Sequence, residues 1–216
     1  QDDTLYFVAG RSMFLDGGLH LWRLDPETGR VLSKTVFDEE DTATGKALQD
    51  YVSWLNMPTA LSDVLSSDGR KIYMRSQSFD LEGKRTAVKS FPRSEDADRG
   101  APPATQDPEE AHLFSPAGFL DDTWWHRSYW LYGSTYVSGW CGYYRAGKTA
   151  PAGRILTFND TNVYGFGRKP QYYRWTTPLE HQLFAARKSP KLVTQTGRDG
   201  RSQEVKQIEH LWNDTI

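Results

Sequence analysis

Short apolar stretches separated by turn residues run along the whole chain, and most of them alternate apolar and polar positions. In residues 19–24 the alternation puts Leu21 and Trp22 on opposite faces. A period of two residues predicts a β-strand. The sequence Asp25–Gly29 then supplies a proline that presets φ and a glycine that accepts positive φ. A returning apolar stretch at 31–37 completes the pattern of a β-hairpin.

The same features predict further strands along the chain. Residues 61–75 read as a second hairpin with its turn at Asp68 and Gly69. Residues 47–54 are compatible with a short helical turn, and residues 179–188 with either a strand or a helical turn. The other expected strands are residues 4–9, 112–114, 118–120, 155–158, 162–166, 171–175 and 208–212.

A degenerate repeat connects these strands. A short apolar strand, a turn with Asp or Asn and an aromatic strand recur at Asp68 with Tyr73, Asp121–Asp122 with Trp125, and Asn159 with Tyr164. Tyr73 and Trp125 are 52 residues apart, and Trp125 and Tyr164 are 39 apart. A period of about 40–50 residues is typical of propeller blades. We therefore predict an all-β fold: a β-propeller or part of one, with about three to four blades of four-stranded antiparallel sheet.

The domain organisation follows from one change in composition. Residues 90–111 are rich in Pro, Asp, Glu and Ala and nearly free of large apolar side chains, which predicts a disordered or loop insertion. Residues 1–89 would form the first blades and residues 112–216 further blades of the same domain. An open propeller leaves strand edges exposed. We therefore expect either another chain to close the ring or this chain to be part of a longer protein.

Composition excludes several classes of function. The net charge is −2, and basic residues are scattered among acidic ones, so no nucleic-acid partner is expected. No apolar run approaches the roughly 18 residues of a membrane span. The single cysteine, Cys141, excludes an internal disulfide and a cysteine-based zinc site within this chain. The histidines lack the spacing of metal ligands, and a Gly-x-Ser-x-Gly nucleophile elbow is absent, so we predict no metal site and no serine hydrolase site.

Residues 124–144 are the densest aromatic segment, with nine Trp or Tyr among 21 residues. Such side chains combine a large apolar area with a polar tip, so they serve either as packing between sheets or as a surface for stacking sugar rings. The interleaved arginines likewise fit an anion-binding channel or cation–π contacts with the rings. The candidate ligand-binding residues are Trp124, Trp125, His126, Arg127, Trp140, Tyr144 and Arg145.

Two segments carry a resemblance to a known family. The sequence Asp25-Pro-Glu-Thr-Gly-Arg30 resembles the Asp-x-x-Thr-Gly-Lys turn of quinoprotein-like β-propellers, also called pyrroloquinoline-quinone-like repeats. In that motif the turn precedes the last strand of a blade and a Trp shortly after it docks between blades; Leu32 stands at that position here. Residues 112–186 resemble large bacterial propeller proteins of planctomycete type. The resemblance implies a propeller in the periplasm or outside the cell, and no particular reaction.

The resemblance also bears on a cofactor. Quinoprotein dehydrogenases hold the quinone ring between a Trp and a disulfide of adjacent cysteines, with Ca²⁺ nearby, and Cys141 has no neighbouring cysteine. We therefore expect no pyrroloquinoline quinone. The function that fits best is a non-catalytic β-propeller module for binding or scaffolding, with other protein chains, the rest of the propeller or glycans as partners. The alternatives are a quinone-dependent oxidoreductase and a carbohydrate-binding or carbohydrate-active protein that uses residues 124–144.

Overall fold

The computed structural model describes nine stretches of the chain: residues 1–42, 44–48, 60–75, 77–86, 111–115, 129–134, 146–170, 180–197 and 200–216. These residues form strands and turns and contain no α-helix, which confirms the all-β prediction. The expected strands at 118–120 and 171–175, most of the helical turn at 47–54 and all but the last residue of the polar insertion at 90–111 lie outside the described residues.

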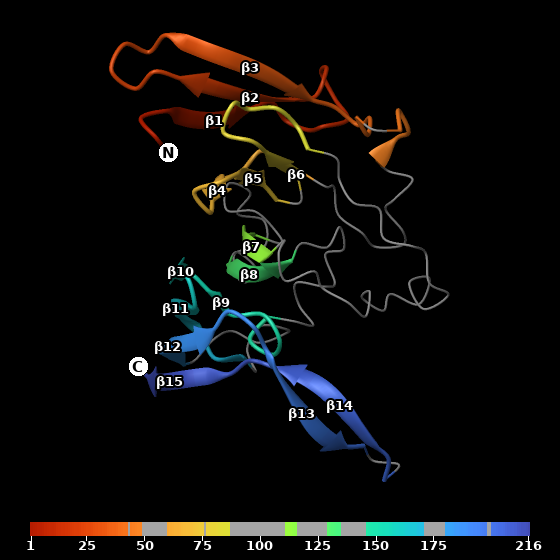
Figure 1. The fold of residues 1–216 in the computed structure, drawn as a ribbon, viewed down its shortest axis with the longest axis vertical. Coiled ribbons are helices and arrows are strands. Elements are labelled where there is room, and N and C mark those ends of the chain that lie inside the picture. The colour runs from red at the N-terminus through yellow and green to blue at the C-terminus, as the bar shows by residue number, and fades with distance from the viewer. Residues whose placement is uncertain are drawn as a thin grey trace.

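Four antiparallel sheets follow one another in chain order (Figure 1). The first contains β1 (Leu5–Ala9), β2 (Leu19–Leu24) and β3 (Val31–Phe37). The second contains β4 (Ser66–Ser67), β5 (Ile72–Met74) and β6 (Gln77–Phe79). The third contains β7 (Ala111–Phe114), β8 (Trp130–Ser134) and β9 (Ala152–Gly153). The fourth contains β10 (Ile155–Phe158), β11 (Asn162–Arg168), β12 (His181–Arg187) and β15 (His210–Thr215).

A fifth element interrupts the fourth sheet. The hairpin of β13 (Lys191–Thr196) and β14 (Ser202–Gln207) leaves after β12 and returns before β15. In Figure 1 this hairpin projects away from the sheets, while both chain termini lie on one side of the molecule. The sheets are arranged in an arc from the first, at the top, to the fourth, at the bottom. None of the described sheets closes on itself.

The number of strands per sheet differs from the prediction. Only the β10–β11–β12–β15 sheet shows four strands among the described residues, and the other three show three each. In the second sheet a further pairing begins with a bridge between Phe79 and Arg85 and a hydrogen bond from the Thr86 amide to the Ser78 carbonyl, at 3.0 Å. Residues 87–110, which follow this pairing, lie outside the described residues.

An apolar core joins the first two sheets. Leu19 and Leu21 are 0 % and 1 % exposed, and the Phe37 ring meets the Phe79 ring edge to face, with centroids 6.5 Å apart. The alternation predicted for residues 19–24 is confirmed, because Trp22 lies on the opposite face of β2 and stacks on Phe7. Burial of alternate side chains therefore fixes which face of the first sheet meets the second.

The turn after β6 docks on the first sheet through its backbone. The Tyr6 hydroxyl donates to the Leu81 carbonyl at 2.7 Å, and Thr35 Oγ1 donates to the Gly83 carbonyl at 2.6 Å. Gly83 has a φ of 85°, and a Cβ there would lie 2.9 Å from Cδ of Arg23. A glycine is favoured here because both the backbone conformation and the close approach exclude larger residues.

Arg85 ties the same two sheets together from the edge. Its Nη1 lies 3.0 Å from Asp38 Oδ1, and its Nη2 donates to the Glu40 carbonyl at 2.6 Å. The guanidinium also lies over the Phe37 ring, 4.4 Å from its centroid. The planar guanidinium thus serves an ion pair, a backbone acceptor and an aromatic face at once, a combination that lysine does not reproduce.

Two turns share one motif and one geometry. In Asp25-x-x-Thr-Gly-Arg the aspartate Oδ1 accepts the threonine amide at 2.9 Å, and the aspartate carbonyl accepts the glycine amide at 2.9 Å. In Asp41-x-x-Thr-Gly-Lys the corresponding distances are both 2.8 Å. The first turn confirms the prediction. The second turn was not among the predicted turns, although its motif is visible in the sequence.

The predicted repeat has a physical counterpart in the second and fourth sheets. Asp68 Oδ1 accepts the amides two and three residues on, at 2.9 and 2.8 Å, and Asn159 Oδ1 does the same at 3.0 and 2.8 Å. In each case the side chain also bonds the tyrosine hydroxyl five residues on, Tyr73 at 2.9 Å and Tyr164 at 3.2 Å. The expected copy at Asp121–Asp122 lies outside the described residues.

We expect Phe79→Ala to lower the free energy of unfolding by about 3–5 kcal/mol, because it removes a fully buried ring from the core between two sheets. Leu192→Ala, at a side chain 62 % exposed on β13, serves as the control and should change it by less than about 0.5 kcal/mol. Urea unfolding followed by tryptophan fluorescence measures both. Equal effects of the two variants would contradict the described core.

Candidate functional site

The predicted ligand-binding residues all lie outside the described residues, so the structure neither brings them together nor separates them: Trp124, Trp125, His126, Arg127, Trp140, Tyr144 and Arg145. Two tyrosines and a leucine are buried in the part of the aromatic segment that is described, residues 129–134. Tyr129 and Leu131 are each 1 % exposed and Tyr132 is 6 % exposed. Neighbours on β8 point to opposite faces, so both faces of this strand are covered.

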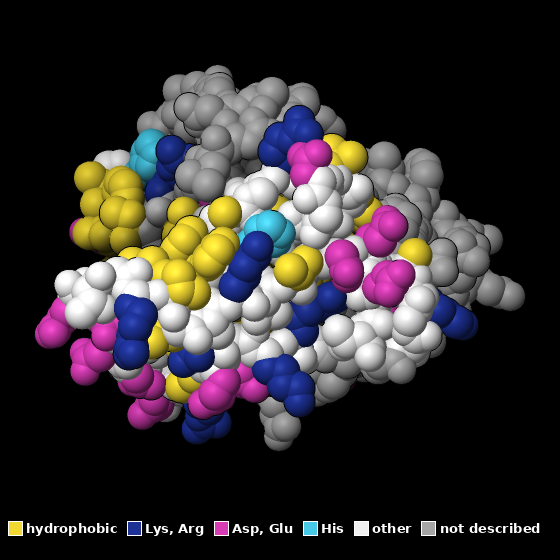
Figure 2. All heavy atoms as spheres, turned by 90° about the horizontal axis from the view of Figure 1, so that it is seen from above, with side chains coloured by type: hydrophobic (Ala, Val, Ile, Leu, Met, Phe, Trp, Pro, Cys, Tyr) yellow, Lys and Arg dark blue, Asp and Glu magenta, His cyan; other side chains and the backbone are white. Residues whose placement is uncertain are grey.

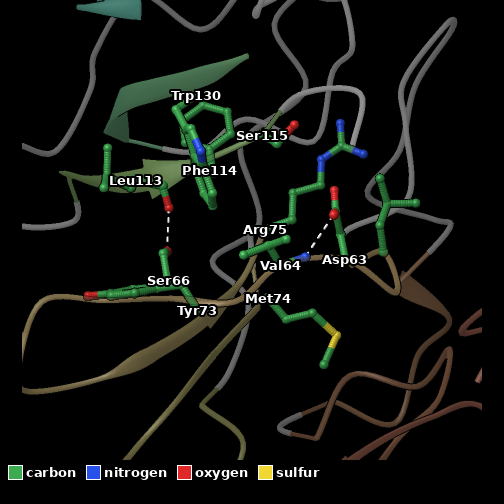
Figure 3. Close-up of a pocket in the computed structure, with 11 residues that line it drawn as sticks. Asp63, Val64, Ser66, Tyr73, Met74, Arg75, Leu113, Phe114, Ser115 and Trp130 are labelled. Atoms are coloured by element: carbon green, nitrogen blue, oxygen red, sulfur yellow. Dashed lines mark hydrogen bonds between the residues drawn. The ribbon is translucent and has the colours of Figure 1, made fainter. Parts of the chain in front are cut away.

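A small cleft lies between the second and third sheets, where Figure 3 shows the side chains that line it. Phe114 and Trp130 come from the third sheet, and Tyr73 and Met74 come from β5 on the opposite side. Ser66 Oγ crosses the junction and donates to the Leu113 carbonyl at 2.5 Å. The cavity volume is about 10 Å³, which is room for about one water molecule.

His112 joins the same two sheets beside this cleft. Its ring is stacked on Tyr73, with centroids 3.8 Å apart and planes 9° apart, and it is 4 % exposed. Its Nε2 lies 2.9 Å from the Arg75 carbonyl. Since a carbonyl oxygen only accepts, Nε2 carries the proton in this contact. Arg75 has a φ of 56° in the turn between β5 and β6, so a side chain of the third sheet caps a turn of the second.

Residues from three sheets meet in a second group, the polar–aromatic cluster, which we define as Asp68, Tyr73, Tyr132, Phe158 and Lys188. The Tyr132 and Phe158 rings, from the third and fourth sheets, have centroids 5.2 Å apart. Lys188 Nζ lies 4.5 Å from the Phe158 centroid and 5.4 Å from the Tyr132 centroid. Asp68, in the turn before β5, bonds the Tyr73 hydroxyl. A cation over two rings is an attractive arrangement.

Burial and charge shift the pKa values within the polar–aromatic cluster. Burial raises the pKa of Tyr132, and the Asp68 carboxylate adds to the shift, so the phenol stays neutral at neutral pH. Burial lowers the pKa of Lys188, although the charges of Asp160 and Asp68 oppose it. Burial acts to raise the pKa of Asp68, but bonds from two backbone amides and the Tyr73 hydroxyl outweigh it, and the net pKa lies below the usual value.

The polar side chains in the cleft and in the polar–aromatic cluster form hydrogen bonds at the junctions between sheets. Ser66, His112 and Asp68 each bond a backbone group or a neighbouring side chain across or beside a sheet junction. The described residues contain no group of three or more His, Cys, Asp or Glu side chains that would hold a metal ion. The cleft, with a volume of about 10 Å³, lies between the second and third sheets, and the polar–aromatic cluster joins residues of the second, third and fourth sheets.

Asp68 and Tyr73 were predicted as repeat positions, on the basis of the turn that Asp68 forms, but their proximity to Tyr132 and Lys188 was not predicted. Lys188 follows β12, and its position depends on how the fourth sheet packs on the third. The sequence of residues 179–188 predicts only a strand or a helical turn and says nothing about that packing.

Comparison with known proteins finds no matching family model, no matching curated protein and no matching solved structure. In the part of the chain that the structure describes, no helix is long and apolar enough to cross a bilayer.

We expect Tyr73→Phe to remove the hydrogen bond to Asp68 while keeping the ring on His112. Stability should fall by about 1 kcal/mol or less, since the carboxylate is largely exposed to solvent. Because the folded pKa of Asp68 is lowered, its contribution is full above the unfolded value of 3.8 and is lost as the pH falls through the lowered pKa. Unfolding measured from pH 7 downward should show the difference between the two proteins narrowing in acid.

Tyr164→Phe is the matched control, because Tyr164 bonds the neutral amide of Asn159 in the equivalent turn. Its effect should not change in acid. A Tyr73→Phe effect that is also independent of pH would contradict the role assigned to the Asp68 carboxylate.

Proposed function

We propose that this chain is a β-propeller module for binding or scaffolding, without catalytic chemistry of its own, and that each of the four stacked sheets is one blade. Three features support the proposal. The sheets are antiparallel meanders that follow one another in chain order along an arc. The second and fourth repeat the same Asx turn and tyrosine. The Asp25 turn precedes β3, the last strand of its sheet, as the quinoprotein-like resemblance implies.

The proposal that the chain lacks catalytic chemistry rests mainly on the hydrogen bonds that the polar side chains make between sheets. At the junction of the second and third sheets, His112 and Ser66 are bound to backbone carbonyls, and the cleft beside them holds about one water molecule. A catalytic site needs groups that converge on an open space where a substrate fits. Here the same residue types support the scaffold, which leaves the loops and outer faces for binding.

Partners of two kinds fit this module. Other protein chains would meet its loops and exposed sheet faces. Glycans would stack on the Trp and Tyr residues of segment 124–144 other than the buried Tyr129 and Tyr132. The single cysteine supports the absence of pyrroloquinoline quinone from this chain. A periplasmic or extracellular location is part of the proposal and follows from the resemblance.

The chain incubated with pyrroloquinoline quinone, Ca²⁺ and a panel of alcohols and aldoses should not reduce an artificial electron acceptor above the rate of a heat-denatured control. Acceptor reduction that needs both the quinone and the folded chain would overturn the non-catalytic proposal and establish the oxidoreductase alternative.

Glycan binding is tested separately on an array with the wild type, Trp125→Ala and Leu192→Ala. We expect any glycan bound by the wild type to lose at least about tenfold in affinity on removal of the Trp125 ring, since stacking on one aromatic ring contributes more than 1 kcal/mol. Leu192→Ala removes an exposed apolar side chain outside the segment and should leave the affinity unchanged. Equal losses in both variants would remove segment 124–144 from the proposed binding surface.

A further inference from the structure

The first sheet has an apolar face that no described part of the chain covers. We call it the first-sheet outer face and define it as Leu5, Phe7, His20, Trp22, Lys34 and Val36, which the strand register places on one side. Leu5 is 50 % exposed, Phe7 39 % and Val36 43 %. Figure 2 views the molecule from the side of this sheet and shows hydrophobic side chains gathered there, with acidic and basic side chains around them.

This face has internal order. The Phe7 and Trp22 rings are parallel within 3°, with centroids 6.1 Å apart, and Lys34 Nζ lies 4.9 Å from the Trp22 centroid. Exposed apolar patches of this kind mark interaction surfaces. The stacked rings present a broad surface that is fixed before a partner arrives, which lowers the cost of binding.

The last sheet has a second such face. We call it the last-sheet outer face and define it as Ile155, Phe166, Leu183, Trp212 and Asp214. Ile155, Phe166, Leu183 and Asp214 stand in one row across the four strands, and Trp212 lies two residues from Asp214 on the same side. Ile155 is 66 % exposed, Leu183 42 % and Trp212 51 %. The opposite face carries Phe158, which meets Tyr132 of the third sheet.

The packing between consecutive sheets of the chain indicates which kind of surface would pack on each outer face. The second sheet packs Phe79 on the sheet before it and Tyr73 on the sheet after it. The third packs His112 backward on Tyr73 and Tyr132 forward on Phe158. The first-sheet outer face therefore corresponds to the side that in the other sheets meets a preceding sheet. The last-sheet outer face corresponds to the side that meets a following sheet.

We infer that two copies of this chain pair head to tail, with the last-sheet outer face of each packed on the first-sheet outer face of the other. The inference rests on the proposed function, in that the contact continues the blade-to-blade packing. Lys34 on the first-sheet outer face is opposite in charge to Asp214 on the last-sheet outer face, whose side also carries the exposed Arg187.

The first and fourth sheets lie at opposite ends of the series of sheets (Figure 1), so one chain presents both outer faces. In the inferred pair, a twofold axis relates the two copies and each copy uses both of its faces. Because the two faces differ in composition, the contact joins unlike surfaces, and closure by the twofold axis prevents growth into a filament.

Sedimentation equilibrium of the wild type should give twice the chain mass of 24.7 kDa. Phe7→Arg and Trp212→Arg should each weaken self-association at least about tenfold, since each puts a charge into both apolar contacts of the pair. The matched control is Leu192→Arg, on the exposed β13–β14 hairpin and away from both faces, which should leave association unchanged.

The decisive step is to mix the two variants. A pair made of Phe7→Arg and Trp212→Arg has one contact with both substitutions and one contact with neither. Head-to-tail packing therefore predicts that the mixture associates more strongly than either variant alone, whereas a contact between identical faces predicts no recovery. Circular dichroism and thermal unfolding confirm that the exposed substitutions leave each variant folded.

A wild type that stays monomeric at all concentrations, a mixture that does not recover, or an equal loss with Leu192→Arg overturns the pairing. These results are separate from those that test the proposed function. If the protein is monomeric and does not reduce the acceptor, the pairing is wrong but the proposed binding module is not contradicted. If the protein forms the pair and reduces the acceptor, the pairing is supported and the non-catalytic role is wrong.

Discussion

Packing of each small sheet against a neighbouring sheet is the constraint on which this structure depends. A sheet of three short strands buries too little apolar area to be stable by itself, so each must find a neighbour. Phe37 and Phe79 supply the contact between the first two sheets, and Tyr73 with His112 supplies the next. Backbone carbonyls bound across these junctions, at Gly83 and Arg75, fix the position of one sheet on another. Apolar burial thus provides the free energy, and the polar bonds select one arrangement.

Local sequence patterns predicted those parts of the fold whose causes are local. The hairpin at 19–37 and the turns at Asp25 and Asp68 depend on alternation and on an aspartate that bonds amides two or three residues away. The β13–β14 hairpin was missed because its strands carry few apolar side chains, so no alternation marks them. The Asp41 turn repeats the Asp25 motif but was not among the predicted turns.

The candidate site was less predictable than the fold. The seven proposed ligand-binding residues fall outside the described residues. The polar–aromatic cluster joins Asp68, Tyr132 and Lys188 across long distances in the chain, and only the packing of three sheets brings them together. For the aromatic segment, packing between sheets was one of the two interpretations left open. Tyr132 in that segment is buried, as this interpretation predicts. Local sequence patterns do not predict which hydrogen-bond partner each buried polar group has in the folded protein.

The β13–β14 hairpin has a consequence for how this protein tolerates change. It leaves the fourth sheet after β12 and returns just before β15, and the two points of departure are held together by a hydrogen bond from the Arg187 amide to the Glu209 carbonyl, at 2.9 Å. The sheet is thus continuous beneath the hairpin, and lengthening its tip costs only a slowly growing loop entropy. An epitope tag, a fluorophore-binding peptide or a whole inserted domain placed at this tip would report on the protein from outside while the sheets beneath keep their packing.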